Sequence, residues 1–356
     1  MNRIILLVIA LIAMSASVPA ARTWIVDQGG TGDALTIQAG IDSAVVGDTV
    51  IVRCDTYYEH DIVMKSGVLL KSETSLSDCV TIDAQGLGRV FICDANPSGT
   101  RIKGFTIKGG HAVGIPPSGT GGAVYITNGG EPYFTRCDLI DNIADGAGGA
   151  VGAYNSAPGF TYCRFSGNHA GTGGGAINFS ACPLPNIYDC VFRNNSAVTY
   201  GGAVYCWNSS SPSVSSCTFV NNSAFLLGAA FYLSLNSQPT LTNCVIAFNA
   251  GGQAIYCGTP GEIPSLSCCD LYGNSGGDWV GLIADQDTAN GNFSSDPLFC
   301  DTTSMEPTIE DCSPCLEGNH PRGYDCGYVV GSSDVGCACG EATEVTSWGT
   351  IKSMYK

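Results

Sequence analysis

The sequence predicts an all-β fold, a parallel β-helix solenoid with three short strands in each turn of about 27 residues. Six cysteines recur at intervals of 26, 27, 27, 27 and 25 residues, which is a repeat period and not a disulfide pattern. An asparagine follows each cysteine by five residues, and a proline precedes each by five. The cysteines are Cys137, Cys163, Cys190, Cys217, Cys244 and Cys269, the asparagines Asn142, Asn168, Asn195, Asn222, Asn249 and Asn274, and the prolines Pro132, Pro158, Pro185, Pro212, Pro239 and Pro264.

Three sets of apolar residues keep the same period, and each set predicts one strand per turn. The first set lies two residues after the prolines, the second lies two residues after the cysteines, and the third follows a run of small residues. The sets are Phe134, Phe160, Ile187, Val214, Leu241 and Leu266; Leu139, Phe165, Phe192, Phe219, Ile246 and Leu271; and Val124, Val151, Ile177, Val204, Phe231 and Ile255. Helices are disfavoured because each interrupting glycine costs about 1 kcal/mol. Strands stacked in register would lie about 4.8 Å apart.

Stacking assigns a physical role to each recurrent residue. We expect the asparagines to form a hydrogen-bonded ladder at one corner, where asparagine also tolerates a left-handed backbone. Glycine pairs such as Gly201 and Gly202 should form another tight corner. The cysteines should point inward as small apolar groups, and some should stay reduced because stacked Cβ vectors are parallel.

The repeats resemble those of the chlamydial polymorphic outer membrane proteins. The resemblance lies in the alternation of GGA(V/I), as in residues 201–204, with FxxN, as in residues 192–195, and it covers roughly residues 121–275. Members of that family are exported adhesins. The resemblance therefore implies a repeat solenoid that works in adhesion at a cell surface.

The N-terminal part is similar to the opening of bacterial proteins of the pectin lyase-like superfamily. The similar segments are residues 36–41 (TIQAGI), 47–52 (GDTVIV) and 56–59 (TYYE). This resemblance implies a right-handed parallel β-helix solenoid. Ile37, Ile41 and Val45 also lie at helical spacing before Gly47, which predicts a short helix that plugs the open end of the solenoid.

These features divide the chain into five parts. We predict a signal peptide over residues 1–20, an N-terminal cap with the first solenoid turns over 21–120, regular repeats over 121–275, a cysteine-rich C-terminal cap over 276–340, and a tail over 341–356. The first turns should hold strands near residues 68–70, 80–82, 90–92 and 102–107. The tail, with Trp348, Ile351 and Met354, is interpreted as a short helix or a disordered end, with a docking or sorting tail as the functional alternative.

The C-terminal cap is predicted to be braced by disulfides. It contains six cysteines, at positions 300, 312, 315, 326, 337 and 339, which allow 15 complete pairings. Residues 296–299 (DPLF) and 313–315 (SPC) resemble the usual ending of secreted bacterial β-helix proteins. Zinc is the alternative for the short cysteine spacings, but an exported context favours disulfides.

The first residues predict export. Arg3 precedes the apolar run of residues 4–14, and residues 18–20 (VPA) form a small-residue cleavage site. The run is too short to span a bilayer, which needs about 20 residues. We therefore expect a secreted or cell-surface protein whose mature chain has no transmembrane segment.

The charge balance excludes two classes of partner. The 15 Lys and Arg residues against 31 Asp and Glu residues give a net charge of −16, which repels nucleic acid and anionic membrane surfaces. We expect a monomer whose partner is a polysaccharide or a cell-surface component.

Candidate catalytic residues occur in two neighbouring repeats. Asp138, Arg164 and His169, with Arg136 and Asp141 close by, could serve a polysaccharide lyase in which calcium neutralises a uronate and a basic group takes the α proton. The alternative is an ion pair between turns, since Arg164 stacks on Asp138.

Tyrosines at the third strand provide candidates for glycan contact. Tyr125, Tyr205, Tyr232 and Tyr256 each follow the inward apolar residue and should face outward, where they could form a platform for sugar rings. Gly152 and Asn178 interrupt the column, and packing under a loop is the alternative.

The sequence thus favours an exported, non-catalytic protein that presents an extended surface for adhesion or glycan contact. A polysaccharide lyase or other carbohydrate-active enzyme on the same fold is the alternative. No cofactor or metal is expected, apart from calcium under the lyase alternative.

Overall fold

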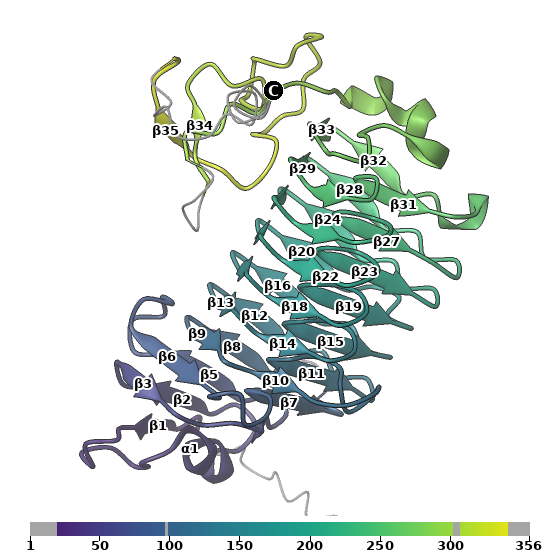
Figure 1. The fold of residues 1–356 in the computed structure, drawn as a ribbon. Coiled ribbons are helices and arrows are strands. Elements are labelled where there is room, and N and C mark those ends of the chain that lie inside the picture. Colours follow the sequence, from purple (N-terminus) through teal and green to yellow (C-terminus); the bar gives the residue numbers. More distant parts are fainter. Residues whose placement is uncertain (1–19, 97–98, 302–306, 341–356) are drawn as a thin grey trace, which may run out of the picture.

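A computed structural model describes residues 20–96, 99–301 and 307–340. The chain forms a stack of similar turns along one axis, with the N-terminal helix at one end and the C-terminal region near the other (Figure 1). Neighbouring turns pair through parallel strands, which confirms the predicted solenoid. Residues 1–19 of the predicted signal peptide and the tail over 341–356 lie outside the described residues.

Three long sheets run along the stack, and each contains one strand from nearly every turn. The first sheet contains β1 (Thr23–Val26), β2 (Thr49–Val52), β5 (Leu69–Ser72), β8 (Arg101–Lys103), β12 (Tyr133–Thr135), β16 (Gly159–Thr161), β20 (Asn186–Tyr188), β24 (Ser213–Ser215), β28 (Thr240–Thr242) and β32 (Ser265–Ser267). The second contains β3 (Asp55–Tyr57), β6 (Val80–Asp83), β9 (Thr106–Lys108), β13 (Asp138–Ile140), β17 (Arg164–Ser166), β21 (Val191–Arg193), β25 (Thr218–Val220), β29 (Val245–Ala247) and β33 (Asp270–Tyr272). The third contains β4 (Ile62–Val63), β7 (Phe91–Asp94), β11 (Val124–Thr127), β15 (Val151–Tyr154), β19 (Ile177–Ser180), β23 (Val204–Trp207), β27 (Phe231–Leu233) and β31 (Ile255–Cys257).

A fourth, narrow sheet was not predicted from the sequence. Its strands have two residues each and lie between the second and third sheets along the chain, and all but the first come directly after a recurrent asparagine. They are β10 (His111–Ala112), β14 (Ile143–Ala144), β18 (His169–Ala170), β22 (Ser196–Ala197), β26 (Ser223–Ala224) and β30 (Ala250–Gly251). A strand of two residues carries too little hydrophobic pattern to be predicted from the sequence. In the structure, these strands are identified by their pairing with the adjacent turns.

Aromatic columns fill the interior. The rings of Phe165, Phe192 and Phe219 stack with centroids 4.5 and 4.6 Å apart, and all three side chains are fully buried. Their strands pair in register, Phe165 with Phe192 and Phe192 with Phe219. Each ring therefore packs against an identical neighbour, as the period predicts.

The asparagine ladder is present and buried. The side-chain amide of Asn168 donates to Asn195 Oδ1 at 2.9 Å, and that of Asn195 donates to Asn222 Oδ1 at 2.9 Å. Asn195 Nδ2 also donates to the Phe165 carbonyl oxygen, and Asn195 Oδ1 accepts from the Asn168 backbone N–H. The ladder provides hydrogen-bond partners for buried backbone groups at a corner where strand pairing does not provide them.

The left-handed backbone lies one residue earlier than predicted. The residues directly before the ladder asparagines have positive φ, and the asparagines do not. These residues are Asp141, Gly167, Asn194, Asn221, Phe248 and Gly273. The correction has a physical reason: the asparagine needs a side-chain direction into the corner, while the residue before it makes the bend.

Glycine forms the corner before the third sheet. Gly201 has a φ of 60°, and a Cβ on Gly202 would collide with the Ala229 carbonyl oxygen of the next turn. Close approach between turns therefore requires glycine here.

Helix α1 (Ile37–Ser43) covers the N-terminal end of the stack, as predicted. Thr36 Oγ1 caps it by accepting from the Ala39 N–H, and Glu59 accepts from the first two N–H groups of the helix. Val45 does not belong to the buried helical face, because the helix ends at Ser43 and Val45 is 55% exposed.

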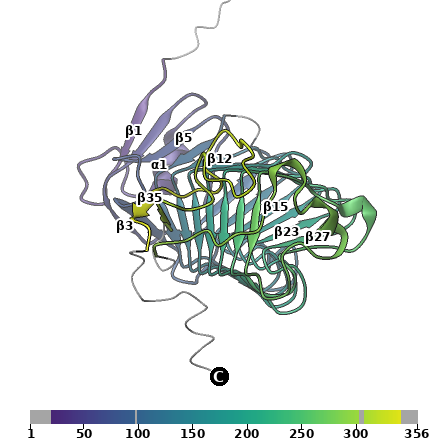
Figure 2. The same cartoon turned by 90° about the horizontal axis from the view of Figure 1, so that it is seen from above.

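The C-terminal region does more than cap the end. The 3₁₀ helices η1 (Pro260–Glu262), η2 (Gly281–Gln286) and η3 (Ala289–Gly291) lie at the last turns. The chain then folds back along the outer face of the second sheet, where Ile309 and Val330 pack on Val245 and Ala247 (Figures 1 and 2). The short strands β34 (Ile309–Glu310) and β35 (Val335–Cys337) belong to this region.

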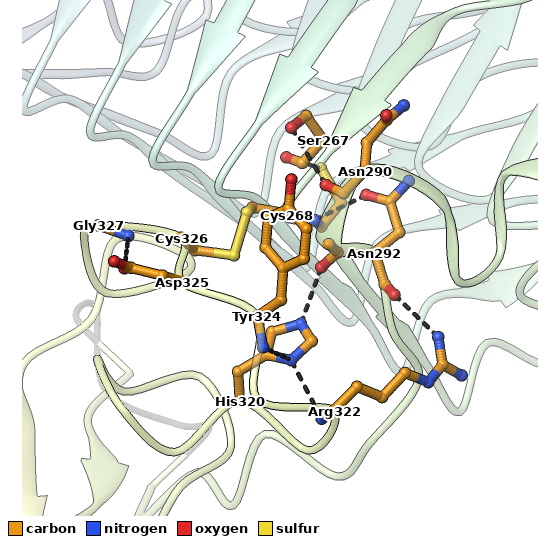
Figure 3. Close-up of a disulfide and its surroundings, with 12 residues drawn as sticks. Ser267, Cys268, Asn290, Asn292, His320, Arg322, Tyr324, Asp325, Cys326 and Gly327 are labelled. Atoms are coloured by element: carbon orange, nitrogen blue, oxygen red, sulfur yellow. Dashed lines mark hydrogen bonds between the residues drawn. A yellow bond between two sulfur atoms is a disulfide. The ribbon is translucent and has the colours of Figure 1, made fainter.

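Disulfides brace the C-terminal region, as predicted. Two lie within it, Cys300–Cys337 and Cys312–Cys339, and a third joins Cys326 to Cys268 in the solenoid (Figure 3). Beside that link, His320 accepts the Arg322 N–H at Nδ1 and donates from Nε2 to the Gly291 carbonyl oxygen. Cys54–Cys79 joins two early turns.

The six recurrent cysteines are buried and unpaired, as expected for inward positions. Their thiols lie among apolar side chains, and burial raises the pKa of Cys269 well above its usual value of 9.0. They serve as small core residues.

The ladder predicts a large stability loss on truncation. Asn195→Ala removes the side-chain bonds to Asn222 and to the Phe165 carbonyl oxygen, and it leaves the Asn168 backbone N–H without its acceptor. The free energy of unfolding should therefore fall by about 2–4 kcal/mol. Urea unfolding measures the loss. The exposed Asn186→Ala should change stability by less than about 0.5 kcal/mol, and equal losses in both variants would contradict a ladder role.

The docked C-terminal region predicts a pH dependence. Asp270 lies beneath it and accepts from the Ser295 N–H at 3.0 Å and from the Cys315 thiol at 3.5 Å. Burial raises the pKa of Asp270 well above its usual value of 3.8, and Asp278 and Asp296 add to the shift. The folded state thus keeps the proton to higher pH than the unfolded chain. The contribution of Asp270 to stability is therefore fully present below pH 3.8 and is lost as the pH rises through the folded pKa.

Asp270→Asn should therefore be more stable than the unmodified chain at neutral pH, and the difference should vanish as the pH approaches 3.8. Urea midpoints between pH 4 and pH 8 test this. The exposed Asp285→Asn controls for the loss of one charge. Parallel pH curves for Asp270→Asn and the unmodified chain would contradict the assignment.

Candidate functional site

A column of side chains projects from the corner between the first and second sheets. It consists of the residues directly before the recurrent cysteines, which all have φ between 51° and 54°. The column, here called the corner column, contains Arg136, Tyr162, Asp189, Ser216, Asn243 and Cys268. The left-handed backbone points these side chains away from the aromatic core, and they range from the exposed Tyr162 to the buried Asn243.

Asp138 and Arg164 come together as predicted, but as a structural ion pair. They are directly paired in register, and Arg164 Nε lies 3.0 Å from Asp138 Oδ1. Ser77 Oγ donates to Asp138 Oδ2 at 2.8 Å. Asp138 is only 8% exposed, so its carboxylate is held by partners on adjacent turns.

His169 lies apart from that pair. It belongs to β18 in the narrow fourth sheet, and its Nδ1 lies 2.9 Å from Ser196 Oγ. Arg136 and Asp141 occupy the corners before and after the second sheet, and Arg136 lies over the ring of Tyr162. The five charged candidates therefore form no single constellation.

Two adjoining hollows lie between the corner column and residues 328–334 of the C-terminal region. We call them together the flank cleft. The larger hollow has about 530 Å³ and the smaller about 350 Å³. Both are lined by Asp189, Ser332, Ser333 and Asp334. The larger is also lined by Tyr188, Ser216, Asn243 and Tyr328, and the smaller by Tyr162, Arg164 and Thr308.

Residues 328–334 are held in place by hydrogen bonds to three turns. The Gly331 N–H donates to the Asn243 carbonyl oxygen at 2.8 Å, and the Ser332 N–H donates to Thr218 Oγ1 at 2.9 Å. Ser332 Oγ also bonds to Asp189 Oδ1 between the two hollows. The cleft is therefore preformed.

Four tyrosines cluster on the outer face of the third sheet. Tyr200 stacks on Tyr232 with centroids 4.4 Å apart, Tyr232 stacks on Tyr256 at 5.2 Å, and Tyr205 meets Tyr232 edge to face. Partial burial raises the pKa of Tyr205 to about 12, with contributions from Tyr232 and Tyr200. Tyr125 stands apart and packs against Arg89.

This tyrosine cluster agrees with the expected column and adds one member. Gly152 and Asn178 separate Tyr125 from Tyr205 in the strand register, as predicted. Tyr200 was missed because it lies on the preceding loop. The sequence feature that could have identified Tyr200 is its position next to Gly201, where the loop must run close to the next turn.

The flank cleft was also missed. Its wall comes from residues 328–334, which lie far along the chain from the corner column. One signal was available: the outward positions Val191, Val220 and Val245 are apolar, and all three are buried. Apolar outward residues in consecutive turns indicate that another segment covers the sheet.

Three of the four cysteines in the short spacings, Cys312, Cys337 and Cys339, are in disulfides and provide no thiolate ligands for zinc. Within the described ranges, one group of potential ligands consists of Glu310, Cys312 and Cys339. Its two sulfurs form a disulfide, so neither is a thiolate.

Comparison with known families agrees with this geometry. Residues 122–293 match the family model described as right handed beta helix region. The solenoid is a right-handed β-helix. No curated protein matches the chain. Within the described part of the β-helix, no helix is long and apolar enough to cross a bilayer.

The ion pair of the β-helix predicts energetic coupling. Arg164→Ala removes the guanidinium that pairs with the buried Asp138 carboxylate, and Asp138→Ala removes the carboxylate that pairs with Arg164 and accepts from the Ser77 hydroxyl. Each change should lower the free energy of unfolding by about 1–3 kcal/mol. In a double-mutant cycle by urea unfolding, the double variant should lose less than the sum by at least about 0.5 kcal/mol. Additive losses would contradict the pairing.

Proposed function

We propose that this protein is an exported, non-catalytic β-helix that presents an extended surface for adhesion or glycan contact. The observation that carries the proposal is the tyrosine cluster on the third sheet, in which Tyr200, Tyr205, Tyr232 and Tyr256 line consecutive turns with partly exposed rings. Tyrosine combines an apolar ring with a hydroxyl group and suits surfaces that meet both the apolar and the polar parts of a sugar.

The spacing of the cluster favours an extended partner. The rings of Tyr232 and Tyr256 are parallel and 5.2 Å apart, so they repeat at the interval set by the strands. Tyr205, Tyr232 and Tyr256 are paired in strand register, so the cluster extends along the solenoid axis. A chain of sugar residues, which is itself periodic, can contact several members of such a cluster at once.

The contacts of the charged candidates support a non-catalytic role. A lyase base must reach the proton that it removes. Asp138 is instead occupied by Arg164 and Ser77, and His169 lies in a different sheet beside Ser196. These residues hold turns together.

Export is supported by the pattern of residues 1–20 and by the four disulfides, since disulfides persist in oxidising compartments. We place the mature chain outside the cytoplasm, secreted or at the cell surface, as a monomer. The resemblance of the repeats to polymorphic outer membrane proteins, and of the first turns to the pectin lyase-like superfamily, supports the same proposal.

A polysaccharide lyase is the second candidate, favoured by the presence of Arg164 with Asp189 and Asp334 around the flank cleft. Such an enzyme would use calcium bound by carboxylates. Incubation with pectin, pectate and alginate, with and without calcium, tests it by the absorbance of unsaturated uronate products. Product formation that is lost in Arg164→Ala would replace the non-catalytic proposal.

The non-catalytic proposal predicts binding without turnover. On a glycan array and in co-sedimentation with insoluble polysaccharides, Tyr232→Ala should weaken binding about tenfold, because Tyr232 contacts three other rings and a loss of about 1.4 kcal/mol corresponds to that factor. The exposed Tyr154→Ala, outside the cluster, should bind normally. If no glycan binds the unmodified chain, the proposal fails.

A further inference from the structure

We infer that the flank cleft is a binding site for a short neutral oligosaccharide. The inference rests on the proposed function and gives it a second, recessed site with a defined class of ligand. The site lies on a different face from the tyrosine cluster, at the corner of the first and second sheets. Its five supporting features are its volume, its unsatisfied polar atoms, its aromatic rings, its charge and its backbone conformation.

The cleft has the dimensions of a ligand site. Its hollows of about 530 and 350 Å³ each fall in the range of about 300–1,000 Å³ that is typical of small-molecule pockets. The bond between Asp189 and Ser332 lies between them. A short oligosaccharide can place one part in each hollow, with its linkage beside this bond.

Two polar atoms that line the cleft lack partners among the described residues. Asn243 is 6% exposed, and its Oδ1 accepts no hydrogen bond. Ser333 Oγ is also buried and without a partner. Leaving such groups unsatisfied costs about 1–3 kcal/mol each. A side-chain rotation must open these covered atoms to the cleft. A sugar hydroxyl can then donate to Asn243 Oδ1 and exchange a hydrogen bond with Ser333, so a carbohydrate supplies what both atoms lack.

Three tyrosines frame the cleft with accessible rings. Tyr162 and Tyr188 meet at 80° with centroids 6.0 Å apart, and Tyr328 stands opposite on the C-terminal region with 73% of its surface exposed. An edge-to-face pair leaves ring faces open, in contrast to the parallel rings of Tyr232 and Tyr256. Open ring faces can pack against the apolar face of a sugar.

The charges select a neutral ligand. Asp189 and Asp334 line both hollows, and the Arg164 guanidinium is paired with Asp138. Carboxylates accept strong hydrogen bonds from hydroxyl groups but repel uronate, sulfate and phosphate groups. The cleft therefore favours neutral sugars over acidic ones.

The backbone of the corner column also favours a role for its side chains. Tyr162, Asp189 and Ser216 hold left-handed conformations that cost about 1–2 kcal/mol for residues other than glycine. At the asparagine corner, glycine occupies the left-handed position in two turns, as Gly167 and Gly273. Glycine is absent from the corner column between positions 136 and 268, where side chains line the cleft.

Titration calorimetry on the full, disulfide-bonded chain tests the site. The probes are neutral cello-, xylo- and manno-oligosaccharides, with oligogalacturonate as the acidic counterpart. Asn243→Gly removes the unsatisfied amide and keeps a residue suited to positive φ, and Tyr328→Ala removes an exposed ring. Each should weaken binding of a neutral oligosaccharide at least tenfold with an unchanged melting temperature. The matched controls Asn155→Gly, also at positive φ, and Tyr154→Ala should bind normally.

The outcomes separate the two proposals. Neutral binding that is reduced in Asn243→Gly and Tyr328→Ala, and unchanged in Tyr232→Ala, supports the cleft. Binding that depends on Tyr232 alone overturns the cleft and leaves the proposed function intact. Preference for oligogalacturonate overturns the neutral class, and a chain that binds no glycan in calorimetry or on arrays overturns both proposals.

Discussion

Parallel hydrogen bonding between successive turns is the constraint on which the rest of this structure depends. It places each residue directly above its counterpart about one period earlier, so every position becomes a column. Inside, this stacks Phe165 on Phe192 and Asn168 on Asn195. Outside, it stacks whatever the sequence supplies, including the tyrosine cluster and the corner column. A β-helix therefore builds an extended surface by repeating the small surface of one turn. Side chains on that surface recur at the spacing of the turns without any additional structural element.

The outer faces are not equivalent, because the C-terminal region covers one of them. In the early turns, the outer face of the second sheet carries polar residues such as Lys108, which contact solvent. In the later turns, the outward residues include Val220 and Val245, and Val245 packs against Ile309 and Val330 of the C-terminal region. This docking buries Asp270 and also creates the flank cleft, since residues 328–334 supply its outer wall. A cleft of this kind needs a flat sheet and a second segment held beside it, here through the disulfide of Cys268.

The columns could be predicted from the sequence, and the features that depend on a distant segment could not. A fixed period identifies neighbours without coordinates, which is why the asparagine ladder and the pairing of Asp138 with Arg164 were predicted. Residues 294–340 have no repeat period, and the pairing of the six cysteines there could not be predicted. One of them, Cys326, pairs with Cys268, which lies outside that region. The left-handed residues were misplaced by one position, because the asparagine pattern marks the ladder and not the bend that serves it.

The two candidate surfaces differ in how they can use their aromatic rings. In the tyrosine cluster the parallel rings cover one another, so a ligand meets mainly ring edges and hydroxyl groups, and an extended polymer gains by touching many of them weakly. In the flank cleft the rings of Tyr162 and Tyr188 lie edge to face, and unsatisfied Asn243 and Ser333 sit nearby. Such a site recognises a short segment by its individual hydroxyl groups. One solenoid thus supports broad contact along one face and selective contact at one corner, and the backbone strain in the corner column is borne by the many turns that stack around it.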